Sequence, residues 1–494
     1  MSSRRKAPIN LDVQEFKTIG YNLVDALSEL LETIYIKKVT LGETPKEIKE
    51  ILGDESLPEH GISAELILSR AQEMLLEHSL FNGHPRFLGY ITSSQAPIGI
   101  LADLLASGVN ANCGANILSP MATAIETQTV NWLAELIGLP NTYGGVLVSG
   151  GNMANFTGFL AGRTQKASKL FKSSGLKNES KEMVLYCSKT THTWVEKAAV
   201  LFGHGSNAIR WVDTHENRKM NISILERLIK EDIENGKVPF MVVGTAGDVS
   251  TGIVDDLGSI GKICEKYKLW FHVDGAYGVP AAIVPEEKEK FKGLEMADSI
   301  ALDPHKWLYS PLEAGCTLVK NSKHLSDTFS SHPEYYNFDS DEADPSVNYY
   351  EYGLQNSRGF RALKVWAAIK QVGKHGYIDM IREDINLAKM FFDQANEHQE
   401  LEAISHNLSI TTLRYVPLNL AEQYKATGFL NDLNQKLLNV LQKEGEVFLS
   451  NAIINGTYCL RGCIVNFRTS EEDISNIIQI IVEKGQRVYS DLKS

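Results

Sequence analysis

Three short segments of this sequence carry residues that could do chemistry together. The first is Leu302-Asp-Pro-His-Lys-Trp307, where Lys306 comes just after a short apolar run and could form an imine with a carbonyl compound. The second is His272-Val-Asp-Gly-Ala-Tyr277, where Asp274 follows an apolar run and precedes two small residues. The third is Val148-Ser-Gly-Gly-Asn-Met-Ala154, where a glycine pair could expose backbone N–H groups to a phosphate.

Each segment also has an ordinary structural explanation when it is taken alone. A glycine pair makes a tight turn between a strand and a helix, an aspartate caps a turn, and a lysine lies on the solvated surface. Together, however, an amine, a carboxylate for a ring nitrogen and N–H groups for a phosphate are what pyridoxal phosphate requires. The combination therefore predicts an enzyme that uses this cofactor.

Short apolar runs of strand length position these segments. Beyond residue 97, seven such runs occur, and stretches of helical periodicity separate most of them. This alternation predicts an α/β fold with a mostly parallel seven-stranded sheet covered by helices. Because such sheets bind ligands at the carboxyl ends of their strands, the loops after these runs are expected to form the site. The runs are 145–149, 183–187, 209–212, 240–243, 270–273, 299–302 and 316–319.

Two smaller regions flank the large domain, which is assigned to residues 97–372. Residues 1–96 contain helical stretches with no strand to pack on, so this arm is expected to fold against the main domain or a second subunit. Residues 373–494 predict a small α+β domain that ends in a helix opened by a Ser470 and Asp473 capping box. Its strands are expected at 410–414, near 447 and at 463–467.

The composition is that of an ordinary globular protein. Hydrophobic residues make up 43% and charged residues 22%, which excludes a disordered chain. The formal net charge of −12, with no basic patch, argues against a nucleic-acid partner. Six scattered cysteines predict neither a disulfide framework nor a metal site, and no apolar run approaches the ~20 residues of a membrane helix. With no signal peptide at its start, the protein is expected to be cytoplasmic.

The chain resembles the pyridoxal-phosphate-dependent group II amino-acid decarboxylases, of the aromatic-L-amino-acid and glutamate decarboxylase type, which have fold type I. The resemblance covers nearly the whole chain, and the Pro-His-Lys-Trp segment is its most specific part. It implies decarboxylation of an L-amino acid to the amine and CO2. The segments that carry it are His84-Pro-Arg-Phe87, Asp303-Pro-His-Lys-Trp307 and Ser357-Arg-Gly-Phe-Arg-Ala-Leu-Lys-Val-Trp366.

The resemblance also implies roles for individual residues. Lys306 would hold the cofactor as an internal imine, Asp274 would pair with its ring nitrogen, and His192 would stack on the ring. Ala276 would pack on the opposite face, and Thr245 would lie near the cofactor and the substrate carboxylate. The residues implied around the phosphate are Gly150, Gly151, Asn152 and His305.

The irregular segment 328–359 is expected to supply a proton donor. After CO2 is lost, the substrate carbon must be protonated, and His332-Pro-Glu-Tyr-Tyr336 places Tyr335 where the family has its loop tyrosine, with Tyr336 as the alternative. Relatives with phenylalanine at this position tend to make aldehydes oxidatively. Tyr335 therefore favours simple decarboxylation.

The expected substrate is an aromatic amino acid. Tyr90, Ile91 and Thr92 resemble the pocket wall of aromatic decarboxylases. Ser357 matches a position that is serine in plant relatives acting on phenols, and Arg358 matches the family arginine near the loop. The resemblance further implies a homodimer with shared active sites, in which the loop reaches the partner's site and the N-terminal helices interlock.

Three alternatives to an aromatic decarboxylase remain. Arg86 lies in a segment shared with glutamate decarboxylases, so glutamate, aspartate or 2,4-diaminobutyrate is an alternative substrate. The second alternative is a pyridoxal-phosphate-dependent aldehyde synthase. The third is a catalytically silent binding protein.

Overall fold

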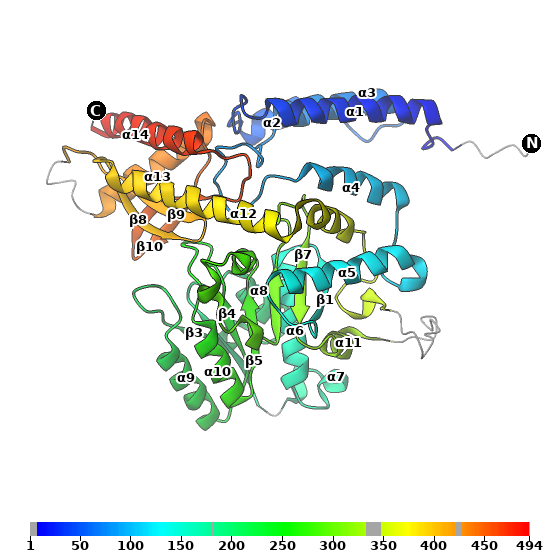
Figure 1. Cartoon of the computed structure of the whole chain (residues 1–494), viewed down its shortest axis with the longest axis vertical. Helices are drawn as coiled ribbons and strands as arrows, with labels where there is room; N and C mark the ends of the chain where they lie inside the picture. Colours follow the sequence, from blue (N-terminus) through cyan, green and yellow to red (C-terminus); the bar gives the residue numbers. More distant parts are fainter. Residues whose placement is uncertain (1–6, 180, 332–346, 421–426, 494) are drawn as a thin grey trace, which may run out of the picture.

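A seven-stranded sheet lies at the centre of the large domain, in the order β1-β7-β6-β5-β4-β2-β3 (Figure 1). The structure is a computed structural model that describes residues 7–179, 181–331, 347–420 and 427–493. Only β7 runs antiparallel to its neighbours, so the predicted mostly parallel sheet is confirmed. The strands are β1 (Gly144–Val148), β2 (Met183–Ser188), β3 (Ile209–Val212), β4 (Val238–Thr245), β5 (Trp270–Asp274), β6 (Ser299–Leu302) and β7 (Gly315–Val319).

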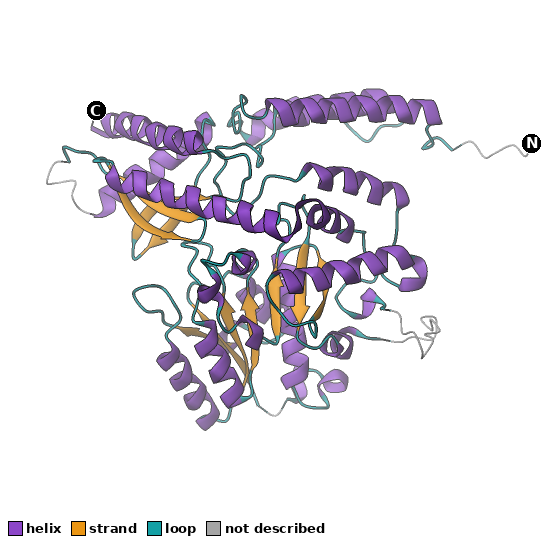
Figure 2. Cartoon of the chain, viewed as in Figure 1, coloured by secondary structure: helices purple, strands orange, loops and turns teal. Residues whose placement is uncertain are grey.

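Helices cover both faces of this sheet (Figure 2). Successive side chains of a strand point to opposite faces, and in β5 Phe271 and Val273 belong to one buried apolar cluster while Trp270 belongs to another. Helix α6 (Gly151–Lys166) packs across β4 to β7. This two-sided burial explains why the strands are nearly continuous apolar runs. The other helices of the region are α4 (Pro97–Val109), α5 (Pro120–Leu136), α7 (Phe171–Ser174), α8 (Trp194–Leu201), α9 (Ile222–Glu234), α10 (Leu257–Tyr267) and α11 (Lys323–Phe329).

The strand order brings the three chemical segments to one edge of the sheet. Strand β5 ends at Asp274, and its neighbour β6 leads directly into the loop that contains Lys306. Strand β1 runs parallel to them and leads through Gly150 into α6. All three segments therefore follow carboxyl ends of strands with a common direction, as predicted.

The N-terminal helices lie along one side of the molecule, beside α4 and the C-terminal region (Figure 1). Helix α1 is capped by Asp12, whose Oδ1 accepts a hydrogen bond from Glu15 N–H at 2.8 Å. Large apolar side chains on α1 and α3 are exposed, including Phe16 at 65% and Leu75 at 63%. The arm is thus only partly covered by its own chain. The helices are α1 (Val13–Thr33), α2 (Pro45–Leu52) and α3 (Ala64–Glu77).

The C-terminal region packs helices on a four-stranded antiparallel sheet in the order β10-β11-β9-β8. Its last helix starts with the expected capping box, in which Ser470 N–H donates to Asp473 Oδ2 at 3.0 Å and Asp473 N–H donates to Ser470 Oγ at 3.2 Å. The elements are α12 (Ala362–Glu397, interrupted at Gly373), β8 (Leu401–Asn407), β9 (Ile410–Tyr415), α13 (Thr427–Glu444), β10 (Ser450–Ile454), β11 (Thr457–Cys463) and α14 (Glu471–Lys493).

Two strand positions in this region were predicted wrongly, and one strand was not predicted. The last strand ends at Cys463 instead of beginning there, because residues after it bond to the N-terminal segment: Phe467 N–H donates to Ser94 Oγ at 3.3 Å. Strand β10 lies just after the expected position near 447, and β8 is an edge strand whose side chains are mostly half-buried, which explains its lack of an apolar run. No helix in the described part of the chain has the length and hydropathy to span a membrane.

Candidate active site

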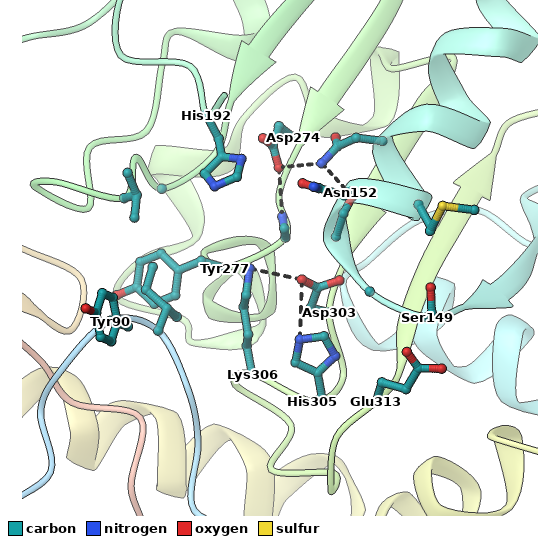
Figure 3. A pocket seen from close by; sticks show the side chains of 18 of the residues that line it. Tyr90, Ser149, Asn152, His192, Asp274, Tyr277, Asp303, His305, Lys306 and Glu313 are labelled. Atoms are coloured by element: carbon teal, nitrogen blue, oxygen red, sulfur yellow. Dashed lines mark hydrogen bonds and ion pairs between the residues drawn. The ribbon is translucent and has the colours of Figure 1, made fainter. Parts of the chain in front are cut away.

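A cavity of about 580 Å³ opens at the carboxyl edge of the large sheet. Figure 3 shows Asp274, Asp303, His305 and Lys306 converging on it. The structure therefore brings residues from distant parts of the sequence into one cavity. The predicted site residues that line it are Tyr90, Ile91, Gly150, Gly151, Asn152, His192, Thr245, Asp274, Ala276, His305 and Lys306.

Lys306 extends into the cavity from the loop after β6 and forms an ion pair there (Figure 3). Its Nζ lies 2.9 Å from Oδ2 of Asp303, whose side chain is 1% exposed. His305 Nε2 lies 3.7 Å from the same oxygen, but burial lowers the pKa of His305 and favours its neutral form. Among the described residues, no donor makes a hydrogen bond to the carboxylate of Asp303, so the ion pair with Lys306 is the principal contact of this buried group.

Asp274 lies at the end of β5, where three donors surround its carboxylate. Trp194 Nε1–H donates to Oδ2 at 2.7 Å, and Asn155 Nδ2–H donates to Oδ1 at 3.3 Å. The backbone N–H of Ala276 donates to Oδ1 at 3.3 Å. These three donors fix the orientation of the carboxylate where it lines the cavity.

His192 and Thr245 contribute an imidazole ring and a hydroxyl group to the cavity. Desolvation by the surrounding protein lowers the pKa of His192, although nearby Asp274 opposes this effect. A neutral, flat ring is suited to stacking on an aromatic group. Thr245 is 4% exposed, and its Oγ1 lies 3.3 Å from Thr191 Oγ1, so a hydrogen bond between hydroxyls fixes its position.

The glycine pair forms an open helix N-terminus. Gly150 has a φ of 147°, which favours glycine, and no side chain caps α6 after it. A Cβ atom at Gly151 would lie 2.6 Å from Asp303 Oδ2, so a larger residue would clash with the Lys306 loop. The first N–H groups of α6 are thus available to bind an anion.

The loop that carries Lys306 is anchored on its far side by aromatic and carboxylate contacts. Trp307 stacks on Tyr277 at 5.0 Å with an interplanar angle of 10°. Trp307 Nε1–H and Tyr309 O–H donate to Oδ2 of Asp384, on α12, at 2.8 and 2.6 Å. These contacts tie the position of Lys306 to the C-terminal part of the chain.

Tyr90 and Ile91 form part of the cavity wall, at its opening. Tyr90 is 59% exposed, has a positive φ of 49° and lies 6.3 Å from the ring of Phe448. Its backbone N–H donates to Ser450 Oγ at 3.3 Å, which links the cavity wall to β10. The aromatic ring is therefore held beside the entrance by contacts with the C-terminal region.

Four predicted site residues are not among those that line the cavity. Thr92 and Ser357 lie outside its wall, and Tyr335 lies outside the described residues. Arg358 is 4% exposed and donates to Glu126 Oε2 at 3.0 Å. Because its guanidinium also bonds to the carbonyl oxygens of Cys113 and Leu147, Arg358 braces the strand before the glycine turn instead of reaching into this cavity.

Sequence reasoning missed three residues that contact the key groups. Asp303 pairs with Lys306, while Asn155 and Trp194 bond to Asp274. Asp303 belongs to the same segment as Lys306, and the spacing of three residues between them was an available signal. The roles of Asn155 and Trp194 depend on how two helices pack on β5, which local sequence patterns do not report.

These groups fit pyridoxal phosphate. Lys306 offers an amine, Asp274 offers a carboxylate for a protonated ring nitrogen, and the uncapped start of α6 offers donors for a phosphate. The close approach of Asp303 to Gly151 leaves no room for a Cβ atom there, and this keeps the start of α6 free of side chains for a phosphate.

Comparisons with known proteins agree with the assignment of this cavity to pyridoxal phosphate. The model of the pyridoxal-dependent decarboxylase conserved domain matches residues 45–415. An aromatic-L-amino-acid decarboxylase from Bacillus atrophaeus is 33% identical over 482 residues, covering 97% of each chain. The crystal structure of 4-hydroxyphenylacetaldehyde synthase from Rhodiola rosea matches with a TM-score of 0.85 and 28% identity, over 97% of this chain and 99% of that one. That of Catharanthus roseus tryptophan decarboxylase in complex with L-tryptophan matches with a TM-score of 0.87 and 25% identity, over 98% and 100%.

Proposed function

This chain belongs to the pyridoxal-dependent decarboxylase family, and from that membership we propose that it converts an aromatic L-amino acid into the corresponding amine and CO2. It is a carboxy-lyase with pyridoxal phosphate as its cofactor. The observation that carries the aromatic substrate is the likeness to the Bacillus enzyme along nearly the whole of both chains. Tyr90 and Ile91 support it, since they place an aromatic ring and an apolar side chain on the cavity wall.

We assign the cofactor to three groups of this cavity. Pyridoxal phosphate, when bound, supplies a sink for the electron pair that the departing CO2 leaves behind. Lys306 would hold it covalently, and the carboxylate of Asp274 would keep a proton on its ring nitrogen. The N–H groups at the start of α6, with Gly150, Gly151, Asn152 and His305, would bind its phosphate.

The remaining cavity residues would orient the reacting molecule. His192, which is favoured in its neutral form, would stack on one face of the ring, and Ala276 would leave room on the other. Thr245, whose hydroxyl position is fixed by Thr191, would bind near the substrate carboxylate. A carboxylate held at a fixed angle to the ring loses CO2 more readily, because the breaking bond aligns with the electron sink.

We assign protonation of the product carbon to Tyr335 on the sequence pattern, with Tyr336 as the alternative. Ser357 and Thr92 are still proposed to contact the substrate. They would do so in a shared active site that a second subunit completes. We assign to Arg358 the role of holding the start of the segment that follows it. Its guanidinium pairs with buried Glu126 and donates to the carbonyl oxygen of Leu147, which ties it to β1.

We also propose a cytoplasmic homodimer in which residues 1–96 form the dimerisation arm. Exposed apolar residues on α1, α3 and α4 support this, among them Phe16, Leu75 and Leu104. All six cysteines are buried and unpaired, as expected in a reducing compartment. Gly373, where α12 is interrupted, supports a boundary between a large domain at 97–372 and a small one at 373–494.

The test is the release of CO2 and amine from a panel of L-amino acids. Tyrosine, tryptophan and phenylalanine are compared with glutamate, aspartate and 2,4-diaminobutyrate. Lys306→Ala is the inactive control, and Lys320→Ala is the matched lysine substitution at the surface. We expect turnover of at least one aromatic substrate and none by Lys306→Ala.

Each alternative gives a different result. Turnover of glutamate, aspartate or diaminobutyrate without aromatic turnover would show an acidic or basic aliphatic substrate. Aldehyde and ammonia in place of amine would show an aldehyde synthase. A protein that shows no visible absorbance band after addition of pyridoxal phosphate, and no turnover, would be a binding protein.

A further inference from the structure

A buried chain of hydrogen bonds ends at the carboxylate of Asp274. Trp270 Nε1–H donates to Ser299 Oγ at 2.8 Å, and this oxygen lies 2.7 Å from His272 Nδ1. His272 Nε2 lies 2.7 Å from Asn155 Oδ1, and Asn155 Nδ2–H donates to Asp274 Oδ1 at 3.3 Å. The first four residues of this network are each at most 2% exposed, so water does not compete with these hydrogen bonds.

The direction of donation in this chain can be read from the Asp274 end. Asn155 lies beside two acceptors, the Asp274 carboxylate and the carbonyl oxygen of Gly151, so both contacts require its NH2 group. Its Oδ1 atom therefore faces His272 and needs a donor. This places a proton on Nε2 of His272 and leaves Nδ1 to accept from the Ser299 hydroxyl.

The other end of this hydrogen-bond network, at Trp270, gives the same direction of donation. The indole of Trp270 is a donor only, so Ser299 Oγ must accept from it. The Ser299 hydroxyl proton is then free to point at His272 Nδ1. Burial lowers the pKa of His272 to about 4, consistent with a neutral ring that carries one N–H. From Ser299 onward, each side chain thus accepts one bond and donates the next toward Asp274.

The His272 ring has little room to move. A Cβ atom at Gly158 of α6 would lie 2.7 Å from Cε1 and Nδ1 of His272, so the helix backbone packs directly on the ring. Trp194 packs against the ring edge at 5.5 Å and donates its own N–H to the other oxygen of Asp274. Packing therefore fixes the ring that sets the orientation of Asn155.

We propose that His272 and Asn155 are positioning residues that hold the carboxylate of Asp274 as a hydrogen-bond acceptor aimed at the ring nitrogen of pyridoxal phosphate. If the Asn155 amide turned over, its oxygen would face the carboxylate, and the Asp274 oxygen would need a proton of its own. The N–H of His272 prevents this rotation. The proposal rests on the use of the cofactor and not on which amino acid is decarboxylated.

The experiment compares two cofactors. The dissociation constants of pyridoxal phosphate and of deazapyridoxal phosphate, in which carbon replaces the ring nitrogen, are measured with cofactor-free wild type, Asn155→Leu and His272→Phe. We expect both variants to bind pyridoxal phosphate about tenfold more weakly, the effect of one lost hydrogen bond to a charged group. With the deaza analogue, which has no ring N–H for Asp274, the difference from wild type should fall below about twofold.

Matched variants control for general damage to the core. Asn434→Leu removes a buried asparagine of the C-terminal region that bonds to the backbone of Tyr415, and His204→Phe removes a histidine stacked on Phe240. Neither residue lines the cavity, so both variants should bind the two cofactors as wild type does. Equal weakening of both cofactors by Asn155→Leu, or no weakening of either, would overturn the proposal.

Two measurements keep the proposal testable if the larger substitutions prevent folding. Ser299→Ala removes the donor to His272 together with the acceptor of Trp270 Nε1–H, and it should weaken binding of pyridoxal phosphate by about threefold, again without effect on the deaza analogue. Nitrogen NMR of histidine-labelled, cofactor-free wild type should show His272 protonated at Nε2 and not at Nδ1. A proton on Nδ1, or a Ser299→Ala effect of equal size on both cofactors, would contradict the direction of the chain. Failure of aromatic turnover would leave these binding results unchanged.

Discussion

The amine of Lys306 lies 2.9 Å from the carboxylate of Asp303, three residues earlier in the same loop. Asp303 is 1% exposed, and a Cβ atom at Gly151 would lie 2.6 Å from its Oδ2. The buried carboxylate of Asp303 therefore lies against both the amine of Lys306 and the start of α6, where the phosphate would bind. An amine must lose its proton before it attacks a carbonyl compound, so this ion pair must separate when the cofactor attaches.

Asp303→Asn should accelerate attachment of pyridoxal phosphate to the cofactor-free protein. Asparagine keeps the shape of the side chain but removes the charge that holds Lys306, and we expect a rate about threefold to tenfold higher at neutral pH. Stopped-flow absorbance measures this rate. Asp327→Asn, which removes the exposed partner of Lys323, is the control. A slower rate would show that Asp303 instead accepts the proton of Lys306.

Asp274→Ala should harm the reaction more than it harms cofactor binding. Without the carboxylate the ring nitrogen loses its proton, so kcat should fall on the order of a thousandfold, whereas cofactor affinity should fall about tenfold. Steady-state kinetics and equilibrium dialysis give the two values. Asp213→Ala, at a carboxylate that is 59% exposed and pairs with Lys189, should change neither. Equal losses in both would contradict this division of roles.

Tyr335→Phe should change the product and not the loss of CO2. A tyrosine O–H can protonate the product carbon, and a phenylalanine cannot, so amine should fall while dissolved O2 oxidises the unprotonated product to aldehyde and ammonia and is itself reduced to hydrogen peroxide. Carbon dioxide release and product chromatography check this, with Tyr336→Phe as the matched variant. An unchanged amine yield in Tyr335→Phe and a lowered yield in Tyr336→Phe would move the role by one residue.

The parts of the site that could be predicted are those set by local pattern. The apolar run before Asp274 is a strand because it is buried on both faces, and a polar residue at its end necessarily lies at the edge of the sheet. The same reasoning placed Lys306 after β6 and the glycine pair after β1. The strands of the C-terminal sheet were harder to place, because β8 is a half-buried edge strand without an apolar run.

The parts that could not be predicted depend on contacts between distant segments. Arg358 was expected near substrate, yet it pairs with Glu126, which lies 232 residues away in the sequence. Asn155 reaches Asp274 only because α6 packs across β5. A single sequence reports which residues are apolar or charged, but not which buried polar groups satisfy one another.

The N-terminal arm should be required for dimerisation. Phe16→Asp and Leu75→Asp each place a charge at an apolar residue that is more than 60% exposed in the single chain. Burying an unpaired charge in an interface costs several kcal/mol, so the dimer dissociation constant should rise at least about a hundredfold. Sedimentation velocity measures it. Leu170→Asp, at an apolar residue that is 66% exposed outside the arm, is the control. A dimer of unchanged affinity in both arm variants would place the interface elsewhere.

Asp384 should make stability depend on pH. Burial raises its pKa to about 7 in the folded protein, although hydrogen bonds from Tyr309 and Trp307 oppose this effect. The unfolded chain loses this proton at about pH 4. Between these values only the folded state binds the proton, so the stabilisation that is present at low pH is lost as the pH rises toward 7.

Asp384→Asn removes this dependence while it keeps an oxygen for Trp307 and Tyr309. Relative to wild type, its free energy of unfolding should rise between pH 5 and pH 8 by on the order of 3 kcal/mol. Denaturant unfolding at several pH values measures the difference. Asp379→Asn, on the same helix with a side chain that is 77% exposed, should run parallel to wild type. Parallel curves for Asp384→Asn as well would mean that Asp384 stays ionised, and the Lys306 loop would then be anchored by a buried charge.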